Sequence, residues 1–464
     1  MSYLLKPLTA LGFTAILLSS CAPAALPPAT FQTPAAFAGP TVATATAPVS
    51  QGAWWLVFSD PTLNDLMARA MEKNNDVKLA AAHFEQARAL LKSSHADLWP
   101  QAGVGYAASR STQFQPAGKA ATTHALDLDL SYEVDVVGRL SNAAKAAHLD
   151  ADASNALLRD TQLLIQSRVA ETYFALRALD EDRAIVRETL AAYRGSLEVT
   201  TRRFQEGDVA ELDVARLQTE VSSTEAEAEA LDQQRAQLAH ALAVLLGEPA
   251  SGFDLTTQAW AEQPWAAAVP AIPAGIPSDL LQRRPDVIAA QASVEAAQRR
   301  VGIAKVAWFP SLSLTASGGY ASGDLGDLFT DTAKTWSLTA LLSQAIFDGG
   351  RRKAGVDYAT GGLDAAFATY QQNVLVAFAD VEDQLSDLSF LQQQQVSEDQ
   401  AVAAAGKAMA MSQSRYTNGS ASQLEVLDAQ RQLLSIRRQA LRVRAAQYES
   451  TVGLIRALGG TWQG

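Results

Sequence analysis

Apolar and polar residues alternate strictly along one stretch in the first third of the chain. From Leu126 to Val136 every even-numbered residue is apolar, and the odd-numbered residues from Asp127 to Asp135 are polar. Because successive side chains of a strand point to opposite faces, the pattern predicts a strand with one apolar and one polar face. At roughly ten residues, such a strand is long enough to cross a bilayer at a tilt. A weaker alternation over 103–110 predicts its hairpin partner.

Helical periodicity precedes and follows this strand pair, and before it one helix is predicted from about residue 62 to 98. Between residues 141 and 206 there is no proline, and apolar residues recur at spacings of three, four and seven, which is typical of one face of a long helix. A second helix is predicted over 210–246, where leucines recur at multiples of seven. A seven-residue repeat predicts left-handed supercoiling against neighbouring helices. The glycine between the two helices, Gly207, readily takes the positive φ of a tight helix-to-helix turn.

The whole pattern occurs twice, so the chain is a tandem duplication of helix, strand hairpin, long helix, turn and return helix. The two turns share a long basic residue, an aromatic residue and a glycine, at a constant offset of 212 residues as from Gly207 to Gly419. The matched residues are Arg203, Phe204 and Gly207 in the first copy and Arg415, Tyr416 and Gly419 in the second. Two copies predict two helical hairpin tips.

The first residues have the pattern of an export signal. Lys6 precedes an apolar run over 8–18 that is too short to span a bilayer, and small residues lead to Cys21. The segment ending at Cys21 is similar to a bacterial lipobox, in which this cysteine becomes the lipidated first residue of the mature chain. The alternative is an ordinary signal peptide that ends near a cysteine. Ala22 rather than aspartate at the next position favours delivery to the outer membrane.

Domain boundaries are expected at the changes in composition and period. We expect a signal peptide over 1–20, a lipidated flexible tether over 21–50, a first repeat over 51–248, a proline-rich linker over 249–277 and a second repeat over 278–464. The first repeat is predicted to contain a strand hairpin over 101–137, a long helix over 141–206 and a return helix over 210–246. The second is predicted to contain a strand hairpin over 311–345, a long helix over 351–417 and a return helix over 421–458.

Composition excludes several classes of function. The net charge of −12 and the lack of any basic stripe argue against a nucleic-acid partner. The chain has a single cysteine and five histidines that show no ligand spacing, so no metal site, cofactor or disulfide framework is predicted. No nucleophile with an adjacent base is recognisable, and we do not expect an enzyme.

Four strands are too few to cross a membrane alone. The smallest membrane barrels have about eight strands, and an open sheet would leave unpaired backbone groups in hydrocarbon. Several copies of the chain are therefore expected to pool their strands.

The chain resembles the TolC-type outer membrane factors, in the lipoprotein branch called NodT or OprM-like. The resemblance covers nearly the whole mature chain and departs at Ala345, where the family usually has proline. The matching segments are Cys21, Trp54-Trp55 with Phe58 and Asp60-Pro61, Asn75-Asp76, Arg284-Pro285-Asp286, Phe309-Pro310, Ile346-Phe347-Asp348-Gly349-Gly350-Arg351, and Leu427-Asp428-Ala429-Gln430-Arg431.

The resemblance implies a mainly α protein with membrane β structure. Three copies would form a homotrimer with one 12-stranded β-barrel in the outer membrane, continued by an α-helical barrel of coiled-coil helices into the periplasm. It also implies that both tips meet a periplasmic adaptor (membrane fusion) protein and, through it, an inner-membrane pump of the resistance-nodulation-division type. The implied docking residues are those matched at the two tips.

Three residues near the second tip match positions that constrict the closed periplasmic end in the family. Leu424 would narrow the pore, while Asp428 and Arg431 would hold neighbouring helices by charge-assisted hydrogen bonds. The alternative is an exposed i, i+3 ion pair without a gating role. Arg216 and Thr219 occupy the positions equivalent to Asp428 and Arg431 in the first copy, so the lock is expected on the second hairpin only.

Four acidic residues are expected in the barrel lumen if the leucines of their strand face lipid. They are Asp127, Asp129, Glu133 and Asp135. An acidic wall would favour cations, and a merely solvated strand face is the alternative.

The function implied is a passive exit duct that conducts small molecules delivered by the pump and adaptor of a tripartite efflux system. Two alternatives stay open. One is the outer membrane channel of a type I protein secretion system, and the other is a lipid-anchored periplasmic coiled-coil protein without a pore.

Overall fold

The computed structural model describes residues 36–37, 53–112, 120–253, 255, 269–273, 275 and 277–461. The signal peptide, Cys21 and nearly all of the tether therefore lie outside the described residues. The elements, in chain order, are η1 (Trp54–Phe58), α2 (Pro61–Lys73), α3 (Asn75–Ala96), β1 (Gln101–Ser111), β2 (Ala121–Val134), α4 (Arg139–Gln205), α5 (Glu211–Leu245), α7 (Pro277–Arg283), α8 (Pro285–Val306), β3 (Ser311–Ser322), η2 (Leu325–Asp327), η3 (Asp331–Ala333), β4 (Lys334–Ser343), α9 (Arg351–Thr417) and α10 (Gln423–Ala457).

The chain forms two compact units that do not follow the two repeats. One unit contains Ala82–Ala156 and Ala289–Gln372, which include all four strands. The other contains Gln32–Ala81, Leu157–Ile288 and Asn373–Gly464, with the tip-side parts of the long helices. Each unit thus combines equivalent segments of both repeats, and in the first unit the strand hairpins of the two repeats pair with each other.

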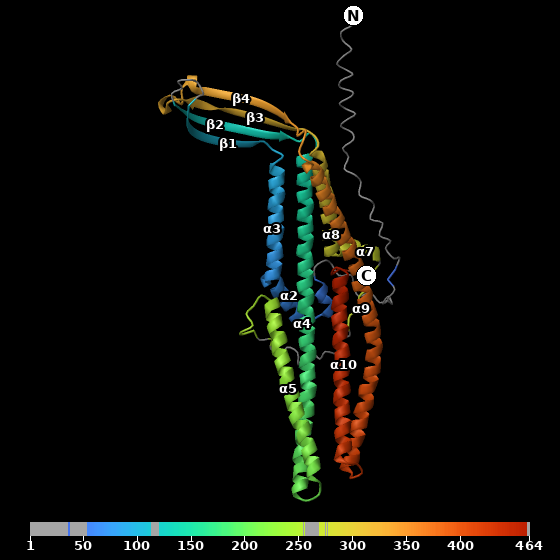
Figure 1. Ribbon diagram of the computed structural model, residues 1–464. Helices are drawn as coiled ribbons and strands as arrows, with labels where there is room; N and C mark the ends of the chain where they lie inside the picture. Colours follow the sequence, from blue (N-terminus) through green and yellow to red (C-terminus); the bar gives the residue numbers. More distant parts are fainter. Residues whose placement is uncertain are drawn as a thin grey trace. The chain divides into compact units, whose positions relative to one another are not determined.

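The four strands form one antiparallel sheet in the order β1-β2-β3-β4 (Figure 1). Leu128 lies opposite Val104 on β1 and Gly318 on β3, and Gly318 lies opposite Trp336 on β4. Directly opposed residues share a face, so the alternation in the sequence produces an apolar face across the whole sheet. Within the described chain β1 pairs only with β2 and β4 only with β3, which leaves two sheet edges open to strands of other copies.

The sequence predicted one helix from about residue 62 to 98, and this is wrong: α2 and α3 are separate helices that meet at Asn74. The backbone of Asn74 is extended, with ψ 133°. Its side-chain oxygen accepts hydrogen bonds from the N–H groups of Asp76 (2.8 Å) and Val77 (3.1 Å), while its amide nitrogen donates to the carbonyl of Leu245 (2.8 Å). Asparagine therefore ends one helix, caps the next and ties both to the end of α5.

Two glycines allow the return helices to end against the start of each repeat. Gly247 follows α5 with φ 68°, and a Cβ there would lie 2.4 Å from the carbonyl oxygen of Lys73. Gly459 follows α10 with φ 81°, and a Cβ there would lie 2.8 Å from the carbonyl oxygen of Arg283. The junctions α2–α3 and α7–α8 are thus each packed against the end of a return helix in the same way, as expected for two copies of one repeat.

The segment before α2 is anchored between α4 and α10 by aromatic packing. Trp54 is buried and its Nε1 donates to Gln166 of α4 (3.0 Å). The ring of Phe58 lies 4.8 Å from that of Phe174 on α4 and 6.0 Å from that of Tyr448 on α10. This short helix therefore joins one helix of each hairpin.

Asp60 completes this anchor with its buried carboxylate. Its Oδ1 caps α2 by accepting from the N–H groups of Thr62 (2.9 Å) and Leu63 (3.2 Å). Its Oδ2 accepts from the Tyr173 hydroxyl (2.6 Å) and the Arg177 guanidinium (2.9 Å) of α4. These hydrogen bonds offset the cost of burying the carboxylate charge. The sequence motif around Asp60 therefore has a structural role, because it fixes the start of α2 to α4.

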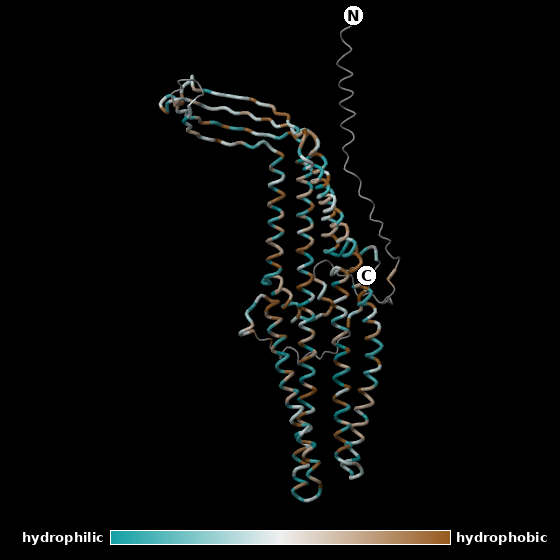
Figure 2. The backbone as a smooth tube through the Cα atoms, in the orientation of Figure 1, coloured by the Kyte–Doolittle hydropathy of each residue, from teal (hydrophilic) through white to brown (hydrophobic). Residues whose placement is uncertain are grey.

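Polar and apolar residues are interspersed along the long helices (Figure 2). Among the described residues, no helix has the length and apolar character needed to cross a membrane.

Asp160 on α4 is a carboxylate in unfavourable surroundings, and its replacement should stabilise the protein. Burial first, and then the charge of Asp286, raise the pKa of Asp160 above its ordinary value against the opposing effect of Arg284 and Arg456. Since the folded state prefers the protonated form, the associated stability is complete below the ordinary pKa and is lost as the pH rises through the raised one. Asp160→Asn should therefore raise the unfolding temperature near neutral pH, by roughly 2 °C.

The same substitution should have little effect at about pH 3, where the wild-type carboxyl is already protonated. Thermal unfolding followed by circular dichroism at both pH values measures this difference. Asp364→Asn, on the exposed surface of α9, is the matched control. An equal gain at both pH values would contradict the explanation by charge burial.

Candidate functional site at the helix tips

Both helical hairpins, α4–α5 and α9–α10, end in the same backbone turn. In the first, the N–H of Asp208 donates to the carbonyl of Arg203 (2.8 Å) and that of Gly207 to the carbonyl of Phe204 (3.0 Å). Gly207 has φ 87° and Gly419, in the second turn, has φ 72°. The paired 6→1 and 5→2 bonds define a Schellman turn, which requires a left-handed residue at this position. Glycine at both tips is thus a backbone requirement.

Direct side-chain contacts join the two tips. The guanidinium of Arg203 donates to the hydroxyl of Tyr416 (2.9 Å) and its carbon lies 6.0 Å from the centre of that ring. Arg415 forms an ion pair across its own turn with Glu425 (2.6 Å). Phe204 is 41% exposed. The predicted tip residues therefore form one small surface, in which Arg203 and Tyr416 contact each other and Phe204 remains accessible.

Arg431 has a partner that the sequence did not reveal. It forms an ion pair with Glu220 of α5, and a longer one with Asp428 of its own helix (3.4 Å). The Glu220 side chain is only 15% exposed. Arg431 therefore links the second hairpin to the first within one chain, and Asp428 is its secondary partner. Leu424, one turn nearer the tip, is 39% exposed.

A small apolar cluster lies beside this ion pair. Leu427 of α10 is 1% exposed and packs with residues of the first hairpin. Its buried partners are Leu190 and Tyr193 of α4 and Leu217 and Val221 of α5. Near the tips, the two hairpins are thus joined by one ion-pair site and one inserted leucine, in addition to the contact of Arg203 with Tyr416. The sequence places Leu427 in a segment that matches the family but does not reveal this contact.

The ionisation states of Arg431 and Tyr193 do not change near neutral pH. The hydrogen bond to Glu220 is the main cause that raises the pKa of Arg431, with burial opposing it. Burial raises the pKa of Tyr193 to about 12, and Glu220 adds to this effect while Arg431 opposes it. The tyrosine hydroxyl is therefore neutral and the arginine charged under physiological conditions.

Two of the four acidic residues assigned to the lumen have local partners. Glu133 accepts two hydrogen bonds from Arg139 (3.0 and 2.7 Å). Asp135 lies beyond the end of β2 and caps α4, accepting from the N–H groups of Leu140 (2.9 Å) and Ser141 (2.8 Å). Both residues therefore fix the turn from strand to helix, and their assignment to the lumen stays a prediction.

Asp127 and Asp129 lie on the polar face of the sheet beside small residues. Asp127 is opposite Gly105 and Gly319, and Asp129 is opposite Gly103 and Ser317. A Cβ at Gly319 would lie 2.0 Å from the carbonyl oxygen of Leu126, so only glycine fits there. Their assignment to the lumen stays a prediction.

Across the described part of the chain, no group of three or more histidine, cysteine, aspartate or glutamate side chains is placed to hold a metal ion.

Known proteins with the same duplicated architecture identify the family. The sequence profile of the family described as outer membrane efflux protein matches residues 66–248 and 276–460. The solvent efflux pump outer membrane protein SrpC of Pseudomonas putida is 34% identical over 415 residues, which cover 87% of this chain and 86% of SrpC. The pyoverdine export outer membrane protein OpmQ of Pseudomonas putida is 32% identical over 440 residues, covering 93% of this chain and 92% of OpmQ.

A solved channel has the same fold. The structure of the outer-membrane channel OprN superposes with a TM-score of 0.84 and 30% sequence identity, covering 94% of this chain and 99% of that one. The fold class predicted from the sequence is confirmed, since such structural neighbours are trimeric channels with an α-barrel and a β-barrel. The chain belongs to the outer membrane efflux protein family, whose members are outer membrane channels of efflux systems.

Proposed function

We propose that this protein is the exit duct of a tripartite efflux system and that it conducts small molecules passively. A periplasmic adaptor and an inner-membrane pump of the resistance-nodulation-division type deliver these molecules to the duct. The observation that carries the proposal is the contact between the two hairpins at their tips. One ion-pair site, one inserted leucine and the contact of Arg203 with Tyr416 hold them together, an arrangement that a docking partner can open at modest cost.

The two tips are the docking surface for the adaptor. The exposed ring of Phe204 offers an apolar contact, and Arg203 and Tyr416 already join the tips to each other. Arg415 and the glycines at 207 and 419 shape the same surface. A partner that contacts both tips at once would change the distance between the hairpins, which is how docking would be coupled to opening.

Opening would break the contact of Arg431 with Glu220, while Asp428 of the same helix keeps its ion pair with Arg431, and would withdraw Leu427 from its cluster. This makes Asp428 and Arg431 parts of the lock, as the family resemblance implied, with Glu220 as the main acceptor. Leu424 would narrow the closed pore. The lock is thus a two-state element whose equilibrium an adaptor can shift.

The duct is anchored by lipid at Cys21 as well as by its strands. In the lumen, Asp127 and Asp129 favour the passage of cations. Small molecules are the proposed cargo because SrpC is named for solvent efflux and OpmQ for pyoverdine export.

The proposal is tested in a Gram-negative strain that lacks its own outer membrane efflux channel but keeps an adaptor and a pump. Expression of this chain with the adaptor and pump from its own gene neighbourhood should restore export of a fluorescent small-molecule substrate, and the purified protein should form channels in a planar bilayer. Export of a type I secretion substrate instead would favour the first alternative. Absence of conductance would favour the coiled-coil lipoprotein without a pore.

Cys21→Ala serves as the matched variant in this experiment. It should abolish globomycin-sensitive processing yet leave the channels in the bilayer, because the strands also hold the protein in the membrane. Unchanged processing would show that Cys21 is not the lipidated residue.

A further inference from the structure

Helices α5 and α10 are linked by two ion pairs of the same kind. Arg431 pairs with Glu220 and Arg438 pairs with Glu227, and both pairs join residues 211 positions apart. The two arginines are one heptad apart, as are the two glutamates, so the pairs lie on the same faces of two parallel supercoiled helices. We refer to them as the lower pair (Arg431–Glu220, nearer the tip) and the upper pair (Arg438–Glu227).

The upper pair is much more strongly built than the lower one. Arg438 also binds Asp182 of α4 with two nitrogens, at 2.7 and 3.0 Å. It thereby joins three helices, whereas the second partner of Arg431 is Asp428 on its own helix. The Arg438 side chain is 23% exposed and that of Arg431 46%. A less exposed, doubly bonded arginine is less screened by solvent and harder to release.

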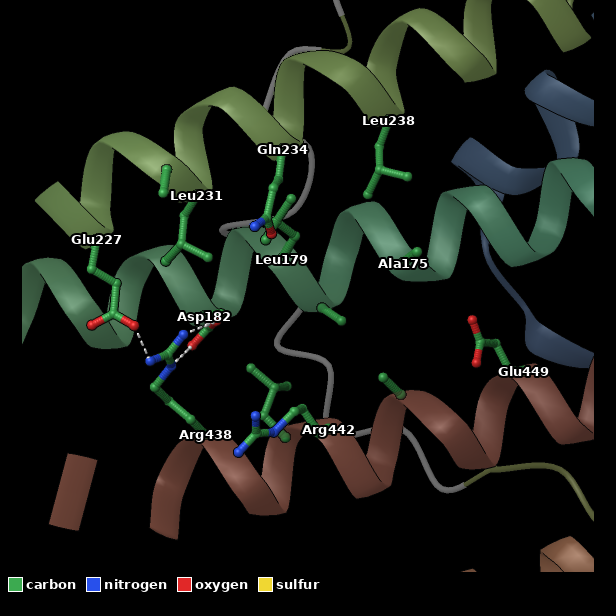
Figure 3. Close-up of a pocket in the computed structure, with 14 residues that line it drawn as sticks. Ala175, Leu179, Asp182, Glu227, Leu231, Gln234, Leu238, Arg438, Arg442 and Glu449 are labelled. Carbon is green, nitrogen blue, oxygen red and sulfur yellow. Dashed lines mark hydrogen bonds and ion pairs between the residues drawn. The ribbon is translucent and has the colours of Figure 1, made fainter. Parts of the chain in front are cut away.

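A hollow of about 440 Å³ between α4, α5 and α10 begins at Arg438 and extends away from the tips (Figure 3). Small side chains leave this space open, among them Ala175, Ala178, Ala230 and Ala445. Arg438, Glu227 and Asp182 close its tip-side end, while Glu449 lies toward the other end. Arg437 of α10 also pairs with Glu188 of α4 (2.9 Å), but this pair is more exposed than that of Arg438. Beside the hollow, therefore, the connection between the hairpins depends on Arg438 more than on close apolar packing.

We propose that Arg438 is the positioning residue that fixes where the two hairpins part. When the lower pair and Leu427 release, the tips separate, and the separation stops at Arg438 because its three-helix contact persists. Beyond the hollow, the aromatic contacts of Phe58 with Phe174 and Tyr448 hold α4 and α10 together. This inference rests on the proposed gate, and it assigns to Arg438 a role that Arg431 does not have.

Reversible cross-linking separates the two roles. Cys21 is the only cysteine of the sequence, so two thiols can be introduced in a Cys21→Ala background. Residues that face each other through long side chains are too far apart for a direct disulfide, and a short bifunctional thiol reagent that reductant can cleave is used instead. One variant carries Glu220→Cys and Arg431→Cys, the other Glu227→Cys and Arg438→Cys with Arg431→Ala.

Conductance of the purified protein in a planar bilayer is measured before and after reduction. The link between positions 220 and 431 should hold the channel closed, and its reduction should raise the conductance several-fold. The link between positions 227 and 438 should leave the conductance at the level of Arg431→Ala alone, because these positions do not separate. A link at 227 and 438 that returns the channel to the closed level would overturn the proposal.

The experiment distinguishes failure of the inference from failure of the gate. If Arg431→Ala does not raise the conductance, the proposed gate is wrong whatever the role of Arg438. If Arg431→Ala raises the conductance, Arg431→Ala combined with Arg438→Ala should raise it further, by about twofold or more. Hairpins that separate farther from the tips leave a wider opening.

Arg438→Lys is the conservative variant for this comparison. Lysine keeps the positive charge but cannot bind Asp182 with two nitrogens. In the Arg431→Ala background, the conductance with Arg438→Lys should therefore lie between the conductance with Arg438 and that with Arg438→Ala. A purely structural role would lower the yield of folded protein in the alanine variant without changing the conductance of the channels that form. That outcome would also contradict the proposal.

Discussion

Replacing Asp428 and Arg431 together by alanine is expected to raise the conductance of the isolated channel in a planar bilayer. The double variant removes the ion pair between Arg431 of α10 and Glu220 of α5 and leaves Glu220, 15% exposed, without its cation. Loss of about 1–3 kcal/mol from the closed state corresponds to roughly a 5–150-fold change in the ratio of open to closed channels. Single-channel recording measures this ratio directly as open probability.

The first hairpin offers a matched control. Asp213 and Arg216 form the same i, i+3 ion pair at 3.7 Å on α5, and they lie close to the first tip. Their replacement by alanine should leave the open probability unchanged, because within the described residues Arg216 forms no ion pair with the second hairpin, and its own pair is partly exposed. Equal effects of the two double variants, or no effect of either, would remove Asp428 and Arg431 from the gate.

Gly247→Ala is expected to have the largest effect on folding. The residue needs φ 68°, which costs alanine about 1–2 kcal/mol, and the added Cβ would lie 2.4 Å from the carbonyl oxygen of Lys73. That oxygen belongs to the backbone of α2 and cannot turn away, so the end of α5 must shift. We expect a loss of about 3 kcal/mol or more, since overpacking alone costs about 1–3 kcal/mol.

Gly207→Ala separates the two causes. Its φ is 87°, but no atom lies within 4 Å of the position of a Cβ, so only the cost of the backbone conformation applies. Unfolding temperature and the yield of assembled channel measure both variants. A Gly207→Ala variant that is damaged as severely as Gly247→Ala would show that backbone conformation, not the close approach to Lys73, accounts for the effect.

The sequence predicted the strands and long helices well because their periods are physically determined. The alternation from Leu126 lies in β2, although the strand ends at Val134, two residues before the alternation does, and the proline-free stretch before Gly207 corresponds to α4. The break at Asn74 was missed because helical periodicity continues on both sides of it. Only the contact of its side chain with Leu245, 171 residues away, shows why the chain turns there.

Glu220 was missed for a different reason. Comparing the two copies at a fixed offset finds residues that are alike, whereas the ion pairs join residues that are unlike and come from different copies. The relevant signal was present as carboxylates at positions 220 and 227, which share the heptad spacing of Arg431 and Arg438. It could be used only with the knowledge that α5 and α10 run side by side.

The two ion pairs between α5 and α10 have a consequence for the history of the duplication. In the first copy, Thr219 and Ala226 stand where the second has Arg431 and Arg438. In the second copy, Gln432 and Gln439 stand where the first has Glu220 and Glu227. One half of the gene has therefore become the donor of positive charge and the other the acceptor. Neither half could now replace the other, and an ancestor assembled from identical single repeats would have lacked these two ion pairs.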